Sequence, residues 1–320
     1  MKKTTNALST HSFANTLASD FFKIGKMKSV YIGAAIMFAL ILISFAVLWF
    51  GIGSAQRAYD AANSHYEQVV NDPTSTQEQI DYAENELDEA NRDLASALKG
   101  RHSNLFQFAS LINLELMLAI IIGIFVGKDF SNGTMRLAVA RGTNRLQLYF
   151  SKFIVLATLT AGYMLASLLL CGIFTAIKGY GEAFTGLQFA RLMRTVGLSY
   201  VAIMSSVSIF LMFAFLTRSS GAALGASLGF YIVLGVVVSI LSVRFAIISI
   251  IGGITGNDDS LLNDPMYQAV TYLPMQQINY CITDGKMPIG EGMKFLFMPI
   301  AYTLLSTFVG AFTFLKRDVK

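Results

Sequence analysis

Long apolar runs alternate with shorter polar connections along the chain. Six of these runs approach or exceed the roughly 20 residues that an α-helix needs to cross the hydrocarbon core of a bilayer. The pattern predicts an all-α, polytopic membrane protein with six transmembrane helices. The expected spans are residues 30–51, 106–126, 153–177, 192–216, 221–241 and 293–315.

The segment before the first span, residues 1–29, also has a helical pattern. Four apolar side chains share one face, and three lysines lie near its end; these residues are Phe13, Leu17, Phe21 and Ile24, then Lys23, Lys26 and Lys28. This arrangement is typical of a basic amphipathic helix lying in the interface of the inner leaflet. A simple extension of the first span is the alternative, but Asp20 and the lysines interrupt it. We expect no removable signal peptide, because no apolar core directly follows the N-terminus.

Residues 52–105 form the longest polar stretch and contain ten acidic and four basic residues. Two runs in this stretch repeat apolar positions at a spacing of three and four, which predicts two amphipathic helices. Asn71, Asp72 and Pro73 separate the runs, so we expect a helical coiled-coil hairpin outside the cytoplasm. The hairpin could sense a ligand or cover a substrate exit. A hairpin that serves only in packing or solubility is an equal alternative.

Residues 242–292 are too long and too apolar in their first part to be a plain connection. We expect an extracytoplasmic region in which residues 245–255 could dip into the outer leaflet. Non-helical backbone survives at that depth only when protein buries it.

Composition and charge support the membrane assignment and exclude several functions. Charged residues make up 14% of the chain, against about 25% in soluble domains. The net charge of +4 does not indicate nucleic acid, because the basic residues cluster at the ends of apolar runs. Four of these clusters fall on one side of a six-span chain, which places both termini in the cytoplasm. The 178–191 connection, expected outside, carries two bases and one acid and departs slightly from this rule.

No motif for catalysis, metal binding or nucleotide binding is present. The chain has no G-x-x-x-x-G-K-[ST] loop to hold ATP, and no H-E-x-x-H sequence. His11, His65 and His102 are scattered, and Cys171 and Cys281 form no zinc or disulfide pattern. We therefore expect no catalytic residue, no metal and no cofactor in this chain.

A short basic segment, residues 127–152, separates the second and third spans. Its five basic residues face a single acid, Asp129; they are Lys128, Arg136, Arg141, Arg145 and Lys152. Gly133 can turn the chain, and Thr134 can cap a short helix that runs through Arg141. Gly142 can end that helix, and Thr143 can cap the next one. The segment is therefore predicted to form a turn, a short surface helix, a second turn and then the third span.

This segment resembles the one that follows the second span in ABC-2 type transporter permeases. The residues that carry the resemblance are Asp129, Phe130, Gly133, Thr134, Arg136, Arg141, Gly142, Arg145 and Lys152. The run Tyr272, Leu273 and Pro274 and the C-terminal stretch 315–318 also resemble the family. Many members have Glu at the position of Asp129, and the long outer hairpin is absent from minimal members. The substrate therefore cannot be transferred from those members.

The resemblance implies the membrane subunit of a bacterial ABC exporter. The basic segment would be a coupling helix that docks, through residues 128–152, on separate ATPase subunits holding ATP and Mg²⁺. The permease would work as a dimer with an identical or homologous partner. It would lie in the plasma membrane and export a peptide, drug or amphipathic compound. It would not itself be an enzyme. The alternative is an ABC-type sensor or immunity component, which detects an envelope ligand through residues 52–105 without moving it. An intramembrane enzyme lacks any supporting motif.

Two sets of residues inside the predicted spans are functional candidates. Glu115 lies near the middle of the second span, with Asn113 close by, and a charge at that depth must face protein or water. The two residues would line the substrate path, or Glu115 would form a structural pair, for example with Arg194. Three glycines spaced four apart in the fifth span let another helix approach closely; they are Gly221, Gly225 and Gly229. The resemblance implies a dimer contact there, and packing within the chain is the alternative.

Overall fold

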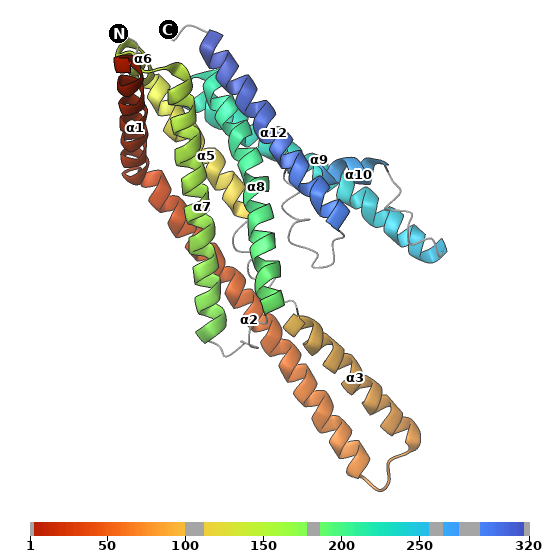
Figure 1. The fold of residues 1–320 in the computed structure, drawn as a ribbon. Coiled ribbons are helices and arrows are strands. Elements are labelled where there is room, and N and C mark those ends of the chain that lie inside the picture. The colour runs from red at the N-terminus through yellow and green to blue at the C-terminus, as the bar shows by residue number, and fades with distance from the viewer. Residues whose placement is uncertain (1–2, 100–111, 178–185, 256–264, 275–288, 317–320) are drawn as a thin grey trace. The chain divides into compact units, whose positions relative to one another are not determined.

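The computed structural model describes residues 3–99, 112–177, 186–255, 265–274 and 289–316. In these ranges the chain forms helices and turns and no strand, which confirms the all-α prediction. Figure 1 shows the helices in order along the chain. They are α1 (Lys3–Gly25), α2 (Lys28–Asn71), α3 (Gln77–Lys99), α5 (Ile112–Ser131), α6 (Thr134–Ala140), α7 (Arg145–Ile177), α8 (Gly186–Thr217), α9 (Ser220–Thr255), α10 (Pro265–Thr271) and α12 (Ile289–Lys316).

Within the residues that the structure describes, five helical stretches are long and apolar enough to cross a membrane. They are Lys28–Asn71, Arg145–Leu170, Met193–Thr217, Ser220–Ile248 and Leu296–Lys316. Each overlaps one of the predicted spans. The remaining predicted span corresponds to α5, which carries Glu115, Lys128 and Asp129 within its 20 residues. The first part of that span, 106–111, lies outside the described residues, so the count of six spans stays a prediction.

The described chain divides into two compact units. One contains Met1–Ala35, Leu111–Ala166 and Ala183–Lys320, and the other contains Ile36–Ser110 and Ser167–Glu182. The long helices α2 and α7 each contribute to both units. The functional residues discussed below lie in the first unit, except those of the hairpin.

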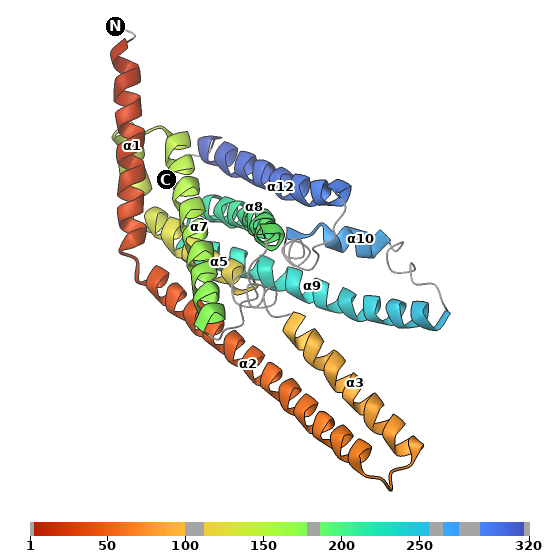
Figure 2. The ribbon, with the colours of Figure 1, turned by 60° about the horizontal axis from the view of Figure 1, so that its bottom comes forward.

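In the second unit, α3 runs back along the polar half of α2 (Figures 1 and 2). Asp72 shapes the turn by accepting a hydrogen bond from the backbone N–H of Thr74, at 2.9 Å. Thr76 and Gln79 then form one half of a capping box, because the Gln79 side chain accepts a hydrogen bond from the Thr76 N–H at 2.9 Å. His65 and Glu86 join the two helices at 3.1 Å. The helical hairpin exists, and its extracytoplasmic position stays a prediction.

In the first unit, α8 packs against α5, α9 and α12. Its core side chains include Ile203, Val207 and Leu211, which have no exposed surface. The α5 and α9 helices approach closely because Gly123 and Gly127 of α5 lack side chains. A Cβ at Gly127 would lie 2.4 Å from the Cα of Ser220, so no larger residue fits without moving the helix.

Two boundaries refine the sequence predictions. The α1 helix ends at Gly25 and α2 begins at Lys28, so the N-terminal helix is separate from the first apolar helix. Its position in the membrane interface stays a prediction. The α9 helix continues through Thr255, so residues 245–255 are helical rather than irregular. Most of the predicted 242–292 outer region lies outside the described residues.

Candidate functional site

The basic segment folds into an elbow made of the end of α5, the short helix α6 and the start of α7. Gly133 precedes α6 with φ 71°, and Gly142 follows it with φ 89°. Both values lie in the left-handed region that glycine adopts without strain. The backbone N–H groups of Gly142 and Thr143 bond to the carbonyls of Val139 and Ala138. These two bonds form a Schellman motif, so the prediction that Gly142 ends the short helix is confirmed.

The predicted threonine caps are wrong. Gly133 occupies the N-cap of α6, and no side chain caps that helix. The Thr134 hydroxyl instead donates to the backbone carbonyl and to Oδ1 of Asp129, both at 2.9 Å. At α7 the cap is Asn144, whose side-chain oxygen accepts from the N–H of Leu146 at 3.0 Å. Both threonines lie one residue away from the position that a cap requires.

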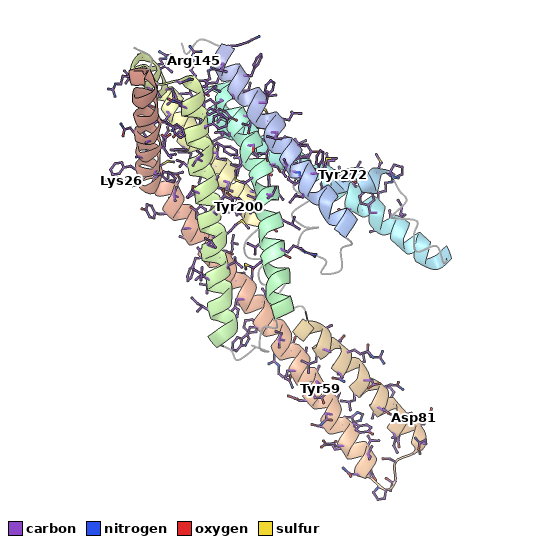
Figure 3. The ribbon with its side chains drawn as sticks, viewed as in Figure 1. Lys26, Tyr59, Asp81, Arg145, Tyr200 and Tyr272 are labelled. Atoms are coloured by element: carbon purple, nitrogen blue, oxygen red, sulfur yellow. The ribbon has the colours of Figure 1, made fainter. Side chains whose placement is uncertain are left out.

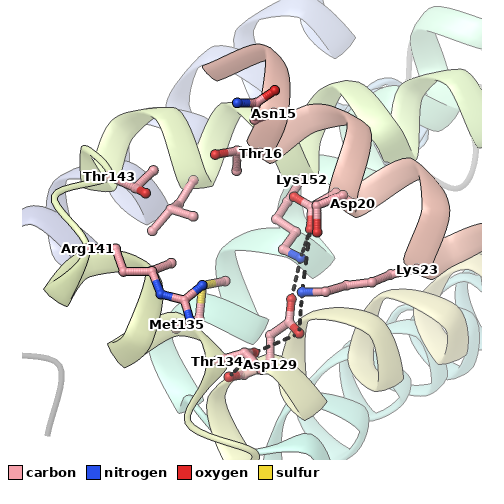
Figure 4. Close-up of a pocket in the computed structure, with 13 residues that line it drawn as sticks. Asn15, Thr16, Asp20, Lys23, Asp129, Thr134, Met135, Arg141, Thr143 and Lys152 are labelled. Carbon is pink, nitrogen blue, oxygen red and sulfur yellow. Dashed lines mark hydrogen bonds and ion pairs between the residues drawn. The ribbon is translucent and has the colours of Figure 1, made fainter. Parts of the chain in front are cut away.

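A buried ion cluster holds the elbow to α1 (Figure 4). Lys152 of α7 is 1% exposed and donates to Oδ1 of Asp20 in α1 at 2.6 Å, and to Oδ2 of Asp129 in α5. Ser151 donates to the other oxygen of Asp20 at 2.7 Å. Lys23 of α1 reaches Oδ1 of Asp129 at 3.3 Å. Three helices therefore converge on one lysine at the elbow.

The cluster also fixes the charge of Asp129, which lies beyond the end of the predicted second span. Burial alone would raise the pKa of this carboxyl. The attraction and hydrogen bond of Lys152, helped by Lys23 and Thr134, outweigh burial and hold the pKa below its ordinary range. Asp129 is therefore ionised at neutral pH, and Lys152 has two charged partners. The Lys152 ammonium also lies 4.1 Å from the centre of the Phe125 ring.

Beneath the elbow, an aromatic cluster joins four helices. The Phe130 ring, at the end of α5, makes edge contacts with Phe215 of α8 at 5.4 Å and with Phe314 of α12 at 6.0 Å between centroids. Phe215 and Phe314 lie 4.9 Å apart, and Tyr149 of α7 lies 4.7 Å from Phe215. Gly310 of α12 leaves room for Tyr149, because a Cβ there would lie 2.8 Å from the tyrosine oxygen.

Arg145 links the elbow to α12 directly. Its guanidinium donates to the carbonyl oxygens of Phe314 and Leu315, at 3.3 and 3.0 Å. These carbonyls belong to the last turn of α12, where they lack helical partners and carry partial negative charge. Figure 3 shows Arg145 at the start of α7, near that end of α12. The guanidinium of Arg145, a predicted docking residue, therefore makes contacts within the chain.

The outer face of α6 remains exposed. Met135 is buried against the rest of the elbow, whereas Leu137 is 57% exposed. Arg136 and Ala140 are exposed beside Leu137. Residues 136, 137 and 140 share one side of a helix, because four residues make about one turn. Leu137 therefore forms a small apolar knob on the outer face of α6, with the Arg136 guanidinium beside it.

The candidates within the membrane-spanning part lie elsewhere in the first unit. The Glu115 carboxylate is buried and accepts a hydrogen bond from Ser206 of α8 at 2.5 Å. Asn113 lies in the first turn of α5, and its side chain is outside the described residues. The three glycines of α9 meet no atom of the described chain within 4 Å of a Cβ built at Gly221, Gly225 or Gly229. The opposite face of α9, at Ser220 and Leu224, packs on α5.

The sequence placed Lys152 in the basic segment but indicated neither its contact with Asp20 nor the exposure of Leu137. Asp20 and Lys152 are 132 positions apart in the sequence, so no local pattern predicts their contact. Only the presence of an acid on the apolar face of α1 hinted that it needed a buried cation. Leu137 had a clearer signal: it lies two residues after Met135, so the two side chains point to opposite sides of a short helix.

No group of three or more His, Cys, Asp or Glu side chains within the described ranges could hold a metal ion. A family model described as "ABC-2 family transporter protein" matches residues 17–319, nearly the whole chain. Neither a curated protein nor a solved structure matches it. Since the family match covers both the elbow and the apolar helices, the chain belongs to the ABC-2 family of transporter proteins, as a membrane-spanning permease subunit.

Proposed function

We propose that this permease works with separate ABC ATPase subunits and exports its substrate, and that the outer face of α6 is the docking surface. The observation that carries the proposal is the exposed Leu137, held beside Arg136 on a helix fixed at both ends. An apolar knob next to a cation fits an apolar recess with an acidic rim on the partner. A few residues contribute most of the affinity of an interface, and arginine is enriched among them.

The fixed ends of α6 make it suitable for transmitting force. The Schellman motif at Gly142 and the Thr134–Asp129 bonds leave the short helix few ways to move alone. A push on Leu137 would therefore displace the whole elbow. Lys152 would carry the displacement to α1, because the buried pair with Asp20 is costly to break.

The same displacement would reach the apolar helices by two routes. Phe130 contacts α8 and α12 through the aromatic cluster, and Arg145 holds the last turn of α12. ATP and Mg²⁺ would stay on the partner, whose closure must favour one arrangement of the helices over the other. A partner that bound both arrangements equally well would move nothing.

The proposed substrate is a peptide, a drug or another amphipathic compound, the class that the family resemblance suggests. Glu115 and Asn113 of α5 are the candidate residues of its path. A buried carboxylate held by Ser206 is a polar site in an apolar bundle, as expected for a path and also for a structural pair. ATP hydrolysis without export of any compound would favour the alternative function, a sensor that uses the acidic hairpin.

The open glycine stripe on α9 supports a permease dimer. Gly221, Gly225 and Gly229 are not covered by any described part of the chain, although their spacing suits a close helix contact. A second copy of the chain, or a homologous permease, would place its own helix there.

The test uses the permease purified with its ATPase and reconstituted in vesicles. In the double variant Arg136→Ala/Leu137→Ala, we expect ATP hydrolysis to fall to the level of the free ATPase and export of a labelled compound to fall at least tenfold. Thermal stability should change little, because exposed substitutions usually change the unfolding free energy by no more than about 0.5 kcal/mol. Val70→Ala, an exposed apolar change in the hairpin, is the control.

Wild-type hydrolysis and export in the double variant would refute docking through this face. Stimulated hydrolysis without depletion of any compound by the wild-type complex would refute export and favour the sensor function.

A further inference from the structure

A polar pocket lies between α1 and the elbow, behind the docking face (Figure 4). Its volume is about 430 Å³, which is within the range of small-molecule sites, roughly 300–1,000 Å³. The α1 side supplies amide, hydroxyl and charged groups, and the elbow supplies threonines and an arginine. The polar lining residues are Asn15, Thr16, Ser19, Asp20, Lys23, Asp129, Thr134, Arg141, Thr143 and Lys152.

The carboxylates of this pocket are already neutralised. Asp20 is held by Lys152 and Ser151, and Asp129 is held by Lys152, Lys23 and Thr134. The Lys152 ammonium is engaged in these contacts, and its side chain is almost fully buried. The pocket therefore does not resemble a cation site, because its acids have cations of their own.

The remaining charge of the pocket is positive. Three cations and two carboxylates line it, so one positive charge is in excess. The Arg141 guanidinium makes no hydrogen bond or ion pair with any described residue, and the side chain reaches toward the pocket in Figure 4. Lys23 is about two-fifths exposed and uses one contact within hydrogen-bond distance, whereas an ammonium has three donors. Arg141 and Lys23 therefore offer unused donors from opposite walls.

We infer that this pocket binds the phosphate group of an anionic phospholipid from the cytoplasmic leaflet. The planar guanidinium of Arg141 matches two phosphate oxygens, and Lys23 adds a second charge. The hydroxyls of Ser19 and Thr143 and the Asn15 amide suit the remaining oxygens of a headgroup, whereas the Thr134 hydroxyl already donates to Asp129. Basic pockets beside transmembrane helices on the cytoplasmic side recognise lipid headgroups in this way.

Neighbouring side chains favour a membrane source over a soluble phosphate compound. Phe22 and Tyr31 are more than three-fifths exposed, and Lys26 lies 4.4 Å from the centre of the Phe22 ring. Exposed aromatic rings with lysines are typical of the boundary between headgroups and acyl chains. Lys23 is within one helical turn of this group, so a lipid lying along α1 brings its headgroup to the pocket.

The test measures lipid binding by the full-length permease without an ATPase, so its outcome is independent of the proposed docking. Purified protein is placed in nanodiscs of phosphatidylcholine containing varied phosphatidylglycerol, and retained lipid is counted by native mass spectrometry. A parallel titration in detergent uses inorganic phosphate and glycerol phosphate. We expect saturable retention of phosphatidylglycerol, and an apparent affinity at least tenfold weaker in Arg141→Ala. Arg136→Ala, the same change on the outer face of α6, should retain wild-type affinity.

Equal retention in wild-type and Arg141→Ala protein would overturn the site. Equal losses in Arg141→Ala and Arg136→Ala would also overturn it, because they indicate general attraction to a charged surface. Binding of soluble phosphate that needs Arg141, without any preference for phosphatidylglycerol, would overturn the lipid source. The folding of Arg141→Ala is checked by thermal unfolding, which should match wild type in phosphatidylcholine alone.

Discussion

Lys152 of α7 donates a 2.6 Å hydrogen bond to the carboxylate of Asp20 in α1, and both side chains are buried. The same ammonium contacts Asp129 of α5. A buried lysine is stable only when opposite charges replace the water that it loses. The Lys152 side chain thus connects α1 with the end of α5 and the start of α7.

Replacing Lys152 by Met should destabilise the permease strongly. The change leaves Asp20 with Ser151 and with Lys23 at 4.0 Å, and removes the closest cation of Asp129. Removing one partner of a buried pair costs about 3–5 kcal/mol. The free energy of unfolding in mixed micelles should fall by that amount, whereas Lys128→Met, at an exposed position of α5, should change it by less than about 0.5 kcal/mol.

The double variant Asp20→Asn/Lys152→Met gives the decisive comparison. It removes one carboxylate together with the lysine, so its cost should be smaller than the sum of the two single costs, by about 1–3 kcal/mol. Additive costs would mean that the two side chains do not stabilise each other.

Acid should weaken the elbow through Asp129. The folded pKa of this carboxyl lies below its unfolded value, because Lys152 and Lys23 more than offset the effect of burial. The unfolded chain therefore binds the proton first, and stability rises with pH across this window. The contribution is fully present above the ordinary carboxyl pKa of about 4 and is lost as the pH falls through the folded pKa.

Melting temperatures measured in detergent between about pH 7 and pH 2 check this sign, because the loss begins only below the unfolded pKa of about 4. Other carboxyls also titrate there, so the useful quantity is the difference between wild type and Asp129→Asn. That difference should be largest at neutral pH and shrink toward acid pH. A difference that grew on acidification would contradict the lowered pKa.

The sequence predicted the local features of the site and missed the long-range ones. The turns at Gly133 and Gly142 were predictable, because a left-handed residue at a helix end selects glycine locally. The apolar helices were also predictable, because a transmembrane span depends on the hydrophobicity of consecutive residues. The Asp20–Lys152 pair and the Phe130–Phe314 contact join distant segments, so only the fold brings them together. The cap predictions failed because Gly133 and Asn144, each one residue from the predicted threonine, occupy the N-cap positions of α6 and α7.

Gly142→Ala should loosen the end of α6. At φ 89° an alanine is strained, by about 1–2 kcal/mol, although no atom lies within 4 Å of the added Cβ. The unfolding free energy should fall by about that amount, and stimulation of the ATPase should fall with it. Gly162→Ala is the matched control, because Gly162 also has open space around it but lies within α7. Alanine favours a helix there, so the control should be neutral or slightly stabilising.

The two faces of α9 separate folding from dimer formation. Gly127 of α5 meets Ser220 on one face, so Gly127→Ala should disrupt the fold itself; a Cβ there would lie 2.4 Å from a backbone atom that cannot rotate away. Gly225 lies on the opposite, open face. Gly225→Leu should therefore keep the melting temperature of the monomer but raise the dissociation constant of the dimer at least tenfold, because a large side chain separates helices that need close approach.

Mass photometry of the detergent-solubilised protein over a concentration series measures the dimer fraction. An unchanged dimer fraction in Gly225→Leu would place the contact elsewhere, whereas a lowered monomer melting temperature would show that this face packs within the chain.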